Sequence, residues 1–184
     1  MDNKENHGKK SLIEIYTTDE EHFSVGIIIH ETEENIFFNF FDEQGKEDGF
    51  CLLKKACILS MKHNTDYLKK MAFYREYWEK NRIEKKSENT LYNSGPDFSE
   101  LLDYAEKAEE IVTISPNLKE EILITGYVKS HNEGEVEIEC IDMETAMPYE
   151  IISISTKDIV YLEIESIDNS LLRYANKALA NKIS

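Results

Sequence analysis

The chain has few of the residues that usually build specialised sites. Its 184 residues include seven glycines, three prolines, three cysteines and one tryptophan. So few glycines leave little room for a phosphate-binding cradle, and neither GxxxxGK[ST] nor GxGxxG occurs. Cys51, Cys57 and Cys140 lack CxxC spacing and stand among apolar residues, which is typical of reduced buried thiols rather than of disulfides or zinc ligands. We therefore expect no cofactor and no metal site.

Long apolar runs are also missing. None approaches the roughly 20 residues that a helix needs to cross a bilayer. Residues 1–10 are polar and lack the apolar segment of a secretory signal. We expect 1–10 to be disordered, no membrane partner and a cytoplasmic location. Abundant Lys, Asn, Ile and Glu favour a bacterial source.

The charge is strongly of one sign. There are 37 acidic and 21 basic side chains, which give a formal net charge of -16. Such a surface repels phosphate backbones and anionic lipid over most of its area. A general nucleic-acid binder is therefore disfavoured, although a local basic face remains compatible with the sequence.

Two parts of the chain consist of short apolar runs bounded by turn residues, which predict β-strands. The first part has runs at 11–16, 23–30, 36–41, 50–53 and 57–61, and the second at 111–115, 121–130, 135–142, 149–155 and 158–164. Gly26 and Asp42 in the first part match Gly126 and Asp142 in the second. This self-similarity predicts two copies of one β unit.

Amphipathic segments follow each set of strands. Residues 64–86 place Leu68, Met71, Tyr74 or Arg75, and Trp78 on one side, and 168–182 repeat the pattern. Asp66 and Asp168 stand where helix N-caps are expected. A third helix is predicted at 97–110, and the polar stretch 86–96, broken by glycine and proline, reads as a linker.

The predicted fold is mainly β with helices. We expect two tandem five-stranded antiparallel SH3-like or Sm-like barrels, each followed by a helix and joined by a helical linker. The first barrel and its helix take residues 11–86, and the linker with its short helix takes 87–110. The second barrel and the C-terminal helix take 111–184.

Both strand sets resemble the Sm-like small-barrel family. Gly26, Asn35, the run "IFFNFF" and Asp42 follow the outline of that family, and the second set keeps Gly126 and Asp142 with Glu135 at the asparagine position. RNA-binding members carry an Arg-Gly pair between the fourth and fifth strands. The chain has "LKKACI" and "STKDIV" there. The resemblance thus implies the fold and argues against ring-type RNA binding.

Carboxylates recur in two hairpin loops. The group comprises Asp42, Glu43, Asp48, Asp142 and Glu144. Paired carboxylates serve as acid and base when burial separates their pKa values. In exposed loops with glycine they usually cap the turn. No GxSxG or Cys-His pattern occurs, so no catalytic residue is predicted, and an enzyme that uses these loops is the weakest hypothesis.

The segment 67–86 combines basic and aromatic residues in an acidic chain. It has more aromatic side chains than one buried helix face requires, and it contains the single tryptophan. In one interpretation the aromatic stripe packs on the barrels and the lysines pair with acidic groups of the same molecule. In the other, this face binds a partner. The candidate partner-binding residues are Lys70, Tyr74, Arg75, Tyr77, Trp78 and Arg82.

The sequence leaves two classes of function open besides the enzyme. We expect a non-enzymatic interaction or adaptor protein that binds an unknown protein partner or a second copy of itself. The alternative is nucleic-acid binding through the basic aromatic helix 67–86, by base stacking and phosphate contacts.

Overall fold

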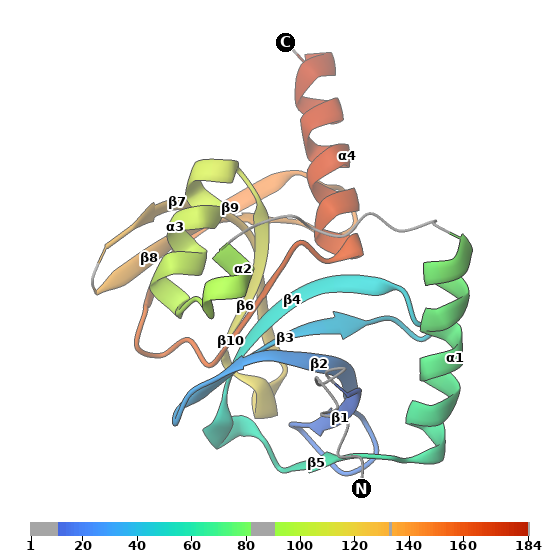
Figure 1. Ribbon diagram of the computed structural model, residues 1–184. Coiled ribbons are helices and arrows are strands. Elements are labelled where there is room, and N and C mark those ends of the chain that lie inside the picture. The colour runs from blue at the N-terminus through green and yellow to red at the C-terminus, as the bar shows by residue number, and fades with distance from the viewer. Residues whose placement is uncertain (1–10, 82–90, 133, 184) are drawn as a thin grey trace, which may run out of the picture.

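A computed structural model of the chain describes residues 11–81, 91–132 and 134–183. It is mainly β, with ten strands in one antiparallel sheet and four α-helices (Figure 1). The strands lie in the order β5-β1-β2-β3-β4-β10-β6-β7-β8-β9. Residues 1–10, expected to be disordered, lie outside the described residues, as do 82–90 at the start of the expected linker.

The elements of the first half come before residue 82. They are β1 (Ile13–Tyr16), β2 (Ser24–Glu31), β3 (Asn35–Phe41), β4 (Glu47–Lys54), the 3-10 helix η1 (Lys55–Cys57), β5 (Ser60–Lys62) and α1 (Asp66–Asn81). The remaining elements are α2 (Leu91–Ser94), α3 (Phe98–Ala108), β6 (Ile111–Asn117), the 3-10 helix η2 (Leu118–Glu120), β7 (Ile122–His131), β8 (Glu135–Ile141), β9 (Pro148–Ser155), β10 (Tyr161–Ile164) and α4 (Ile167–Ile183).

The prediction of two separate five-stranded barrels is wrong. Neither half closes on itself, because β10 from the end of the chain lies between the two halves and pairs with both β4 and β6. Leu162 of β10 is opposite Leu52 of β4 on one side and opposite Ile114 of β6 on the other. The result is one continuous, open sheet with β5 and β9 as its outermost strands.

The reason is the apolar character of β4. Phe50, Cys51, Leu52 and Leu53 are all buried, so the outer edge of β4 needs an apolar neighbour. β5 has the sequence SMK, three exposed residues, and cannot supply one. β10 (YLEI) can, and its Leu162 and Ile164 are fully buried at the junction.

The core is shared between the halves. Its largest cluster joins Phe37, Phe50 and Leu52 of the first half to buried side chains of β6, β7, β8 and β10. On the opposite face of β3 and β4, Ile36 and Leu53 belong to a second cluster with β1. The two central strands are therefore buried on both sides, which explains the dense run of aromatic and aliphatic residues in β3 and β4.

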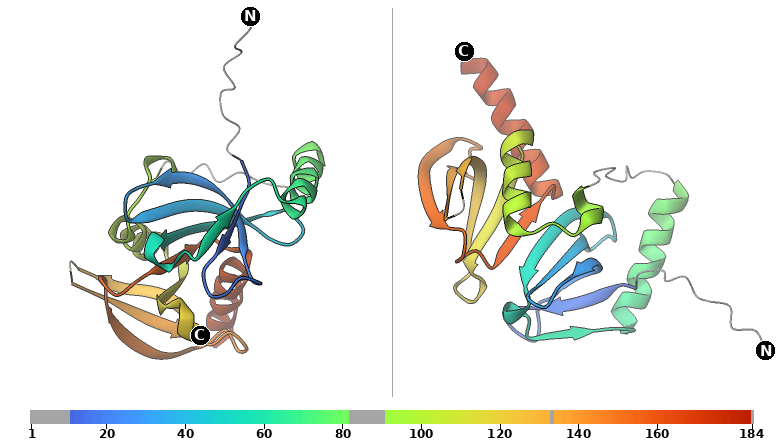
Figure 2. Two further views of the ribbon diagram at one scale, coloured as in Figure 1. Left: turned by 90° about the horizontal axis from the view of Figure 1, so that it is seen from below. Right: turned by 60° about the vertical axis from the view of Figure 1, so that its left-hand side comes forward.

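The helices after residue 90 form part of this core rather than a linker between barrels. Leu101, Leu102 and Ala105 of α3 are fully buried in the largest cluster. The stretch read as a linker contains α2, whose Tyr92 is buried against Phe37 and Phe50. Figure 2 shows α2 and α3 lying against the sheet, while the C-terminal part of α4 projects from it.

Two local predictions are corrected by a few residues. The expected strand 57–61 is a 3-10 turn at Lys55–Cys57 followed by β5. The caps of α1 and α4 are hydroxyl residues rather than Asp66 and Asp168. Thr65 Oγ1 accepts a hydrogen bond from the backbone N–H of Leu68, and Ser166 Oγ accepts one from that of Asn169.

The halves share their strand order and much of their register. β5-β1-β2-β3-β4 in the first corresponds to β10-β6-β7-β8-β9 in the second. Gly26 is opposite Phe40, and Gly126 is opposite Cys140. Both hairpins then shift register at the same distance from these glycines, after Ile28 and after Val128.

One glycine makes the junction possible. Gly49 has φ of +91°, and a Cβ there would lie 2.6 Å from both the carbonyl oxygen of Ile164 and the backbone nitrogen of Ser166. Any side chain would therefore force β4 and the end of β10 apart.

The shared core predicts that the halves unfold together. Leu162→Ala removes a fully buried side chain at the junction and should lower the free energy of unfolding by about 2–5 kcal/mol. Trp78 fluorescence reports on the first half and far-UV circular dichroism on the whole chain. In urea titrations the two signals should change together in wild type and variant. Separate transitions would contradict a shared core, and Leu123→Ala, at an exposed position, is the control.

Candidate functional site

The helix α1 is fixed to the first half of the sheet at its N-terminus and along one face. Thr65 Oγ1 donates a hydrogen bond to the buried carboxylate of Glu14 in β1 while it caps the helix. Leu68 and Met71 are buried against Val25 of β2 and the end of β3. The inward positions therefore have the i, i+3 spacing that the sequence pattern indicates.

Farther along α1, the inward face packs on the turn between β3 and β4. The Arg75 guanidinium lies 4.4 Å from the centre of the Phe41 ring. Trp78 Nε1 donates a hydrogen bond to the Gln44 carbonyl oxygen at 2.8 Å, and Lys46 Nζ lies 4.6 Å from the centre of the Trp78 ring. Arg75 and Trp78 are half-buried and hold the helix to the sheet.

The outward face of α1 exposes aromatic side chains. Phe73 is 71% exposed, Tyr77 56% and Tyr74 41%. Lys70 Nζ lies 4.1 Å from the centre of the Tyr67 ring and 5.3 Å from that of Tyr74. We call Lys70, Phe73, Tyr74 and Tyr77 the α1 surface.

Three of the four cations of described α1 lie beside acidic groups of the same helix. Lys69 Nζ is 2.7 Å from Asp66 Oδ1, and the guanidinium of Arg75 is 3.5 Å from Glu79 Oε1. Lys80 forms an ion pair with Glu76. With four basic and three acidic residues, the described helix is close to neutral. The other basic residues of the predicted basic aromatic segment 67–86 lie at 82–86, outside the described residues.

The structure thus divides the candidate residues. Lys70, Tyr74 and Tyr77 lie together on the α1 surface, Arg75 and Trp78 face the sheet, and Arg82 lies outside the described residues. Phe73 was not in the candidate set although it is the most exposed aromatic of α1. Helical spacing could have found it, because it stands opposite Leu68, Met71 and Arg75 on the helical wheel.

The aspartates of the two hairpin loops serve their own turns. Asp42 Oδ1 accepts hydrogen bonds from the backbone N–H groups of Gln44 (2.9 Å) and Lys46 (2.8 Å). Asp142 Oδ1 accepts from the backbone N–H (2.8 Å) and hydroxyl (2.7 Å) of Thr145. The bonds from Thr145 lower the pKa of Asp142, which keeps it ionised as a turn cap.

Asp48 has a different environment. Its Oδ1 accepts a hydrogen bond at 2.8 Å from the backbone N–H of Ile167, the first residue of α4. Burial raises the pKa of Asp48 to about 6, and the nearby charges of Glu163, Asp168 and Asp42 add to the rise. The carboxylate joins the start of β4 to the helix after β10, so its role in the structure is to connect the two halves.

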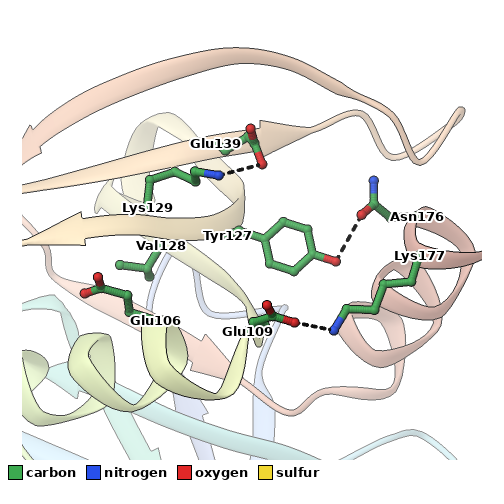
Figure 3. A pocket seen from close by; sticks show the side chains of 8 residues that line it. All are labelled: Glu106, Glu109, Tyr127, Val128, Lys129, Glu139, Asn176 and Lys177. Atoms are coloured by element: carbon green, nitrogen blue, oxygen red, sulfur yellow. Dashed lines mark hydrogen bonds and ion pairs between the residues drawn. The ribbon is translucent and has the colours of Figure 1, made fainter. Parts of the chain in front are cut away.

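A hollow of about 360 Å³ lies among α3, β7, β8 and α4 (Figure 3). Glu109 and Lys177 form an ion pair of 2.8 Å across it, and Lys129 lies 3.5 Å from Glu139. The Tyr127 hydroxyl donates to Asn176 Oδ1 at 3.1 Å. These contacts tie α4 to α3 and β7, and we assign the hollow a structural role.

The histidines near the end of β2 and at the end of β7 have structural contacts. His131 Nδ1 lies 2.9 Å from Asp103 Oδ1, and the bond lowers the pKa of Asp103. The ring of His30 lies so close to Gly95 that a Cβ on the glycine would overlap it. Across residues 11–81, 91–132 and 134–183, no three His, Cys, Asp or Glu side chains cluster in a way that could hold a metal ion.

Comparison with protein-family models, with curated proteins and with solved structures gives no match. The Sm-like or SH3-like resemblance therefore remains an interpretation of the sequence. In the part of the chain that the structure describes, no helix is long and apolar enough to cross a membrane.

The raised pKa of Asp48 predicts a specific pH dependence of stability. The folded state holds a proton on Asp48 up to about pH 6, whereas the unfolded state loses it near its ordinary pKa of 3.8. The contribution of this group to the free energy of unfolding therefore falls as pH rises from about 4 to 6 and is constant above. After allowance for solvent screening, the fall is about 1 kcal/mol.

Asp48→Asn removes this titration and keeps an oxygen that can accept from Ile167. Urea unfolding from pH 4 to 7 should show a smaller fall in unfolding free energy for the variant than for wild type. Asp158→Asn, at an exposed carboxylate, should leave the profile unchanged. Identical profiles for wild type and Asp48→Asn would contradict the assignment.

Proposed function

We propose that the protein is a non-enzymatic interaction module of a bacterial cytoplasm and that it binds a protein partner on the α1 surface. The observation that carries this proposal is the exposure of Phe73, Tyr74 and Tyr77 on one side of a helix whose other side is already packed. Leu68 and Met71 supply the buried face of the helix, and Tyr77 also packs edge-on against Trp78 with ring centres 5.2 Å apart.

The chemistry of the α1 surface suits a partner with an apolar patch. Aromatic side chains offer large contact areas at low cost in conformational entropy, and they are frequent among the residues that dominate binding energy. Beside Phe73, an open groove of about 610 Å³ runs along α1. Its lining combines apolar residues, among them Leu12 and Ile27, with the charged residues Lys69, Arg75, Glu76 and Glu79. An apolar side chain of the partner could enter this groove next to Phe73.

The nucleic-acid alternative has less support. Three of the four cations of described α1 lie beside carboxylates of the same helix. An oligonucleotide would have to displace these acids in a chain of net charge -16. Its distinctive sign would be binding that weakens steeply between low and moderate salt.

The proposal is tested by photocrosslinking in cells of the source organism. A benzoylphenylalanine at position 73 and one at position 77 should crosslink the same protein. Tyr77→Ser should remove the product of the probe at 73, and Phe73→Ser should remove that of the probe at 77. The matched control is position 174, because Tyr174 of α4 is an aromatic residue that is 77% exposed, against 71% for Phe73. It should not give the same product.

The contribution of the aromatic rings to binding is measured as the affinity of the crosslinked partner for the purified protein. The double variant Phe73→Ser/Tyr77→Ser should weaken binding roughly 30-fold or more, which corresponds to about 2 kcal/mol for aromatic anchors. Tyr174→Ser should leave the affinity unchanged. If both variants bind as wild type does, the α1 surface is not the docking site.

A further inference from the structure

The two outermost strands of the sheet differ from well-protected edges. Within the described residues, no strand pairs with the outer edge of β9 or of β5. β9 is eight residues long and contains no lysine, and Ile151 in its middle is 60% exposed. Natural edge strands are usually short, charged or interrupted, because free N–H and C=O groups recruit another strand. Pro148, the charged Glu150 and a register shift protect the first residues of β9, whereas Ile151–Ser155 carry no proline and no charge.

The junction inside the molecule shows what such an edge binds. Ile36 of β3 is opposite Leu53 of β4, and the corresponding Val136 of β8 is opposite Ile154 of β9. β9 therefore corresponds to β4 from Ile151 to Ser155, with Ile154 at the place of Leu53. Glu150 stands at the place of Gly49, so β9 lacks the glycine that lets β4 pass the end of β10, and the matching part of the edge ends before Glu150. The outer edge of β4 is covered by β10.

The other free edge corresponds to the strand that provides this cover. Ile15 of β1 is opposite Met61 of β5, and the corresponding Ile114 of β6 is opposite Leu162 of β10. β5 is thus the counterpart of β10. The molecule has a free β4-like edge at one end and a free β10-like edge at the other.

We propose that β9 of one molecule pairs antiparallel with β5 of a second copy, in the register in which β4 pairs with β10. In this register Ser60 lies opposite Ile154, as Tyr161 lies opposite Leu53 at the junction. Met61 likewise lies opposite Ser153, as Leu162 lies opposite Leu52. Glu163 opposite Cys51 becomes Lys62 opposite Ile152. This surface is separate from α1, so the inference goes beyond the proposed function.

The backbone groups of β9 are oriented for this contact. At the junction, the Lys54 N–H donates to the Val160 carbonyl oxygen at 2.9 Å, so Lys54 and, by alternation along the strand, Leu52 point their N–H groups at β10. The corresponding residues of β9 are Ser155 and Ser153. Their N–H groups therefore point away from β8 and toward the incoming strand.

The side chains add apolar area and charge. The contact covers Ile151 and Met61, which are 60% and 39% exposed in the single molecule. Lys62 lies opposite Ile152, and Glu150 is then its diagonal neighbour on the same face, within reach of a long side chain. β5 is shorter and more polar than β10, so the contact is weaker than the internal junction and reversible.

Pairing of this kind joins unlike edges of identical molecules. A head-to-tail contact leaves one free edge at each end of a dimer, so association continues until a ring closes or a filament grows. Each added copy brings one β9 and one β5 edge. We therefore expect assemblies larger than a dimer, whose average mass rises with protein concentration, rather than a symmetric dimer.

Sedimentation velocity over a concentration series tests the contact. The average mass of the wild type should rise above the 21.4 kDa of one chain as concentration increases. Ser153→Pro removes an outward N–H and Ile151→Lys adds charge to the edge, so both variants should stay at one chain. Leu171→Lys changes a side chain of similar exposure on α4 and should associate as the wild type does.

Crosslinking between two different variants tests the register. In a Cys57→Ser background, Ser60→Cys and Ile154→Cys are prepared separately and oxidised alone or mixed. Ser60 and Ile154 form a pair without mutual backbone hydrogen bonds, where the Cβ atoms approach most closely. The mixture should give a disulfide-linked dimer at least tenfold in excess of either protein alone.

Each outcome decides the proposal. Rising mass that Ile151→Lys abolishes, together with the mixed crosslink, supports it. Wild type that remains one chain at all concentrations overturns it, as does association that Ile151→Lys leaves intact. The proposal is also overturned if the protein stays monomeric and its β9 edge binds an added extended peptide of another protein, because a different partner then occupies the edge.

Discussion

The pairing of β4 with β10 is the contact on which the rest of the structure depends. β4 is apolar along its length, and β10 supplies the neighbour that β5 cannot. Because β10 comes from the end of the chain and also pairs with β6, this contact merges two halves into one sheet. The largest hydrophobic cluster follows from it, since side chains from both halves and from α3 meet there.

The junction also determines where polar groups are used. Gly49 is required where β4 passes the end of β10, and Asp48 beside it accepts from the first N–H of α4. The aspartates that the sequence analysis considered for acid and base chemistry accept hydrogen bonds from backbone N–H groups. The carboxylates of Asp42 and Asp142 cap their turns, and that of Asp48 connects the halves.

Two kinds of surface remain for partners. One is the α1 surface, where aromatic rings lie outside a helix whose inner face is already packed on the sheet. The other is the pair of free strand edges, whose backbone groups repeat the arrangement of the internal junction. These surfaces offer different chemistry, side-chain contact in one case and backbone hydrogen bonding in the other, so the two proposals stand on separate observations.

The sequence by itself determined the local elements well. Periodic apolar runs predicted the mainly β content and the strands other than β5, which lies a few residues later than expected. The inward positions of α1 followed from Leu68, Met71, Arg75 and Trp78. These features depend on neighbouring residues, which a one-dimensional pattern contains. Only the tertiary structure decided that the halves share one open sheet, that α2 buries Tyr92 in the core, and that Phe73 rather than Trp78 faces solvent. The reason is that the free backbone groups of a strand edge can pair with any apolar strand that reaches them. β5 and β10 are about 100 residues apart in the chain, so which of them pairs with β4 depends on long-range packing that the local pattern does not contain.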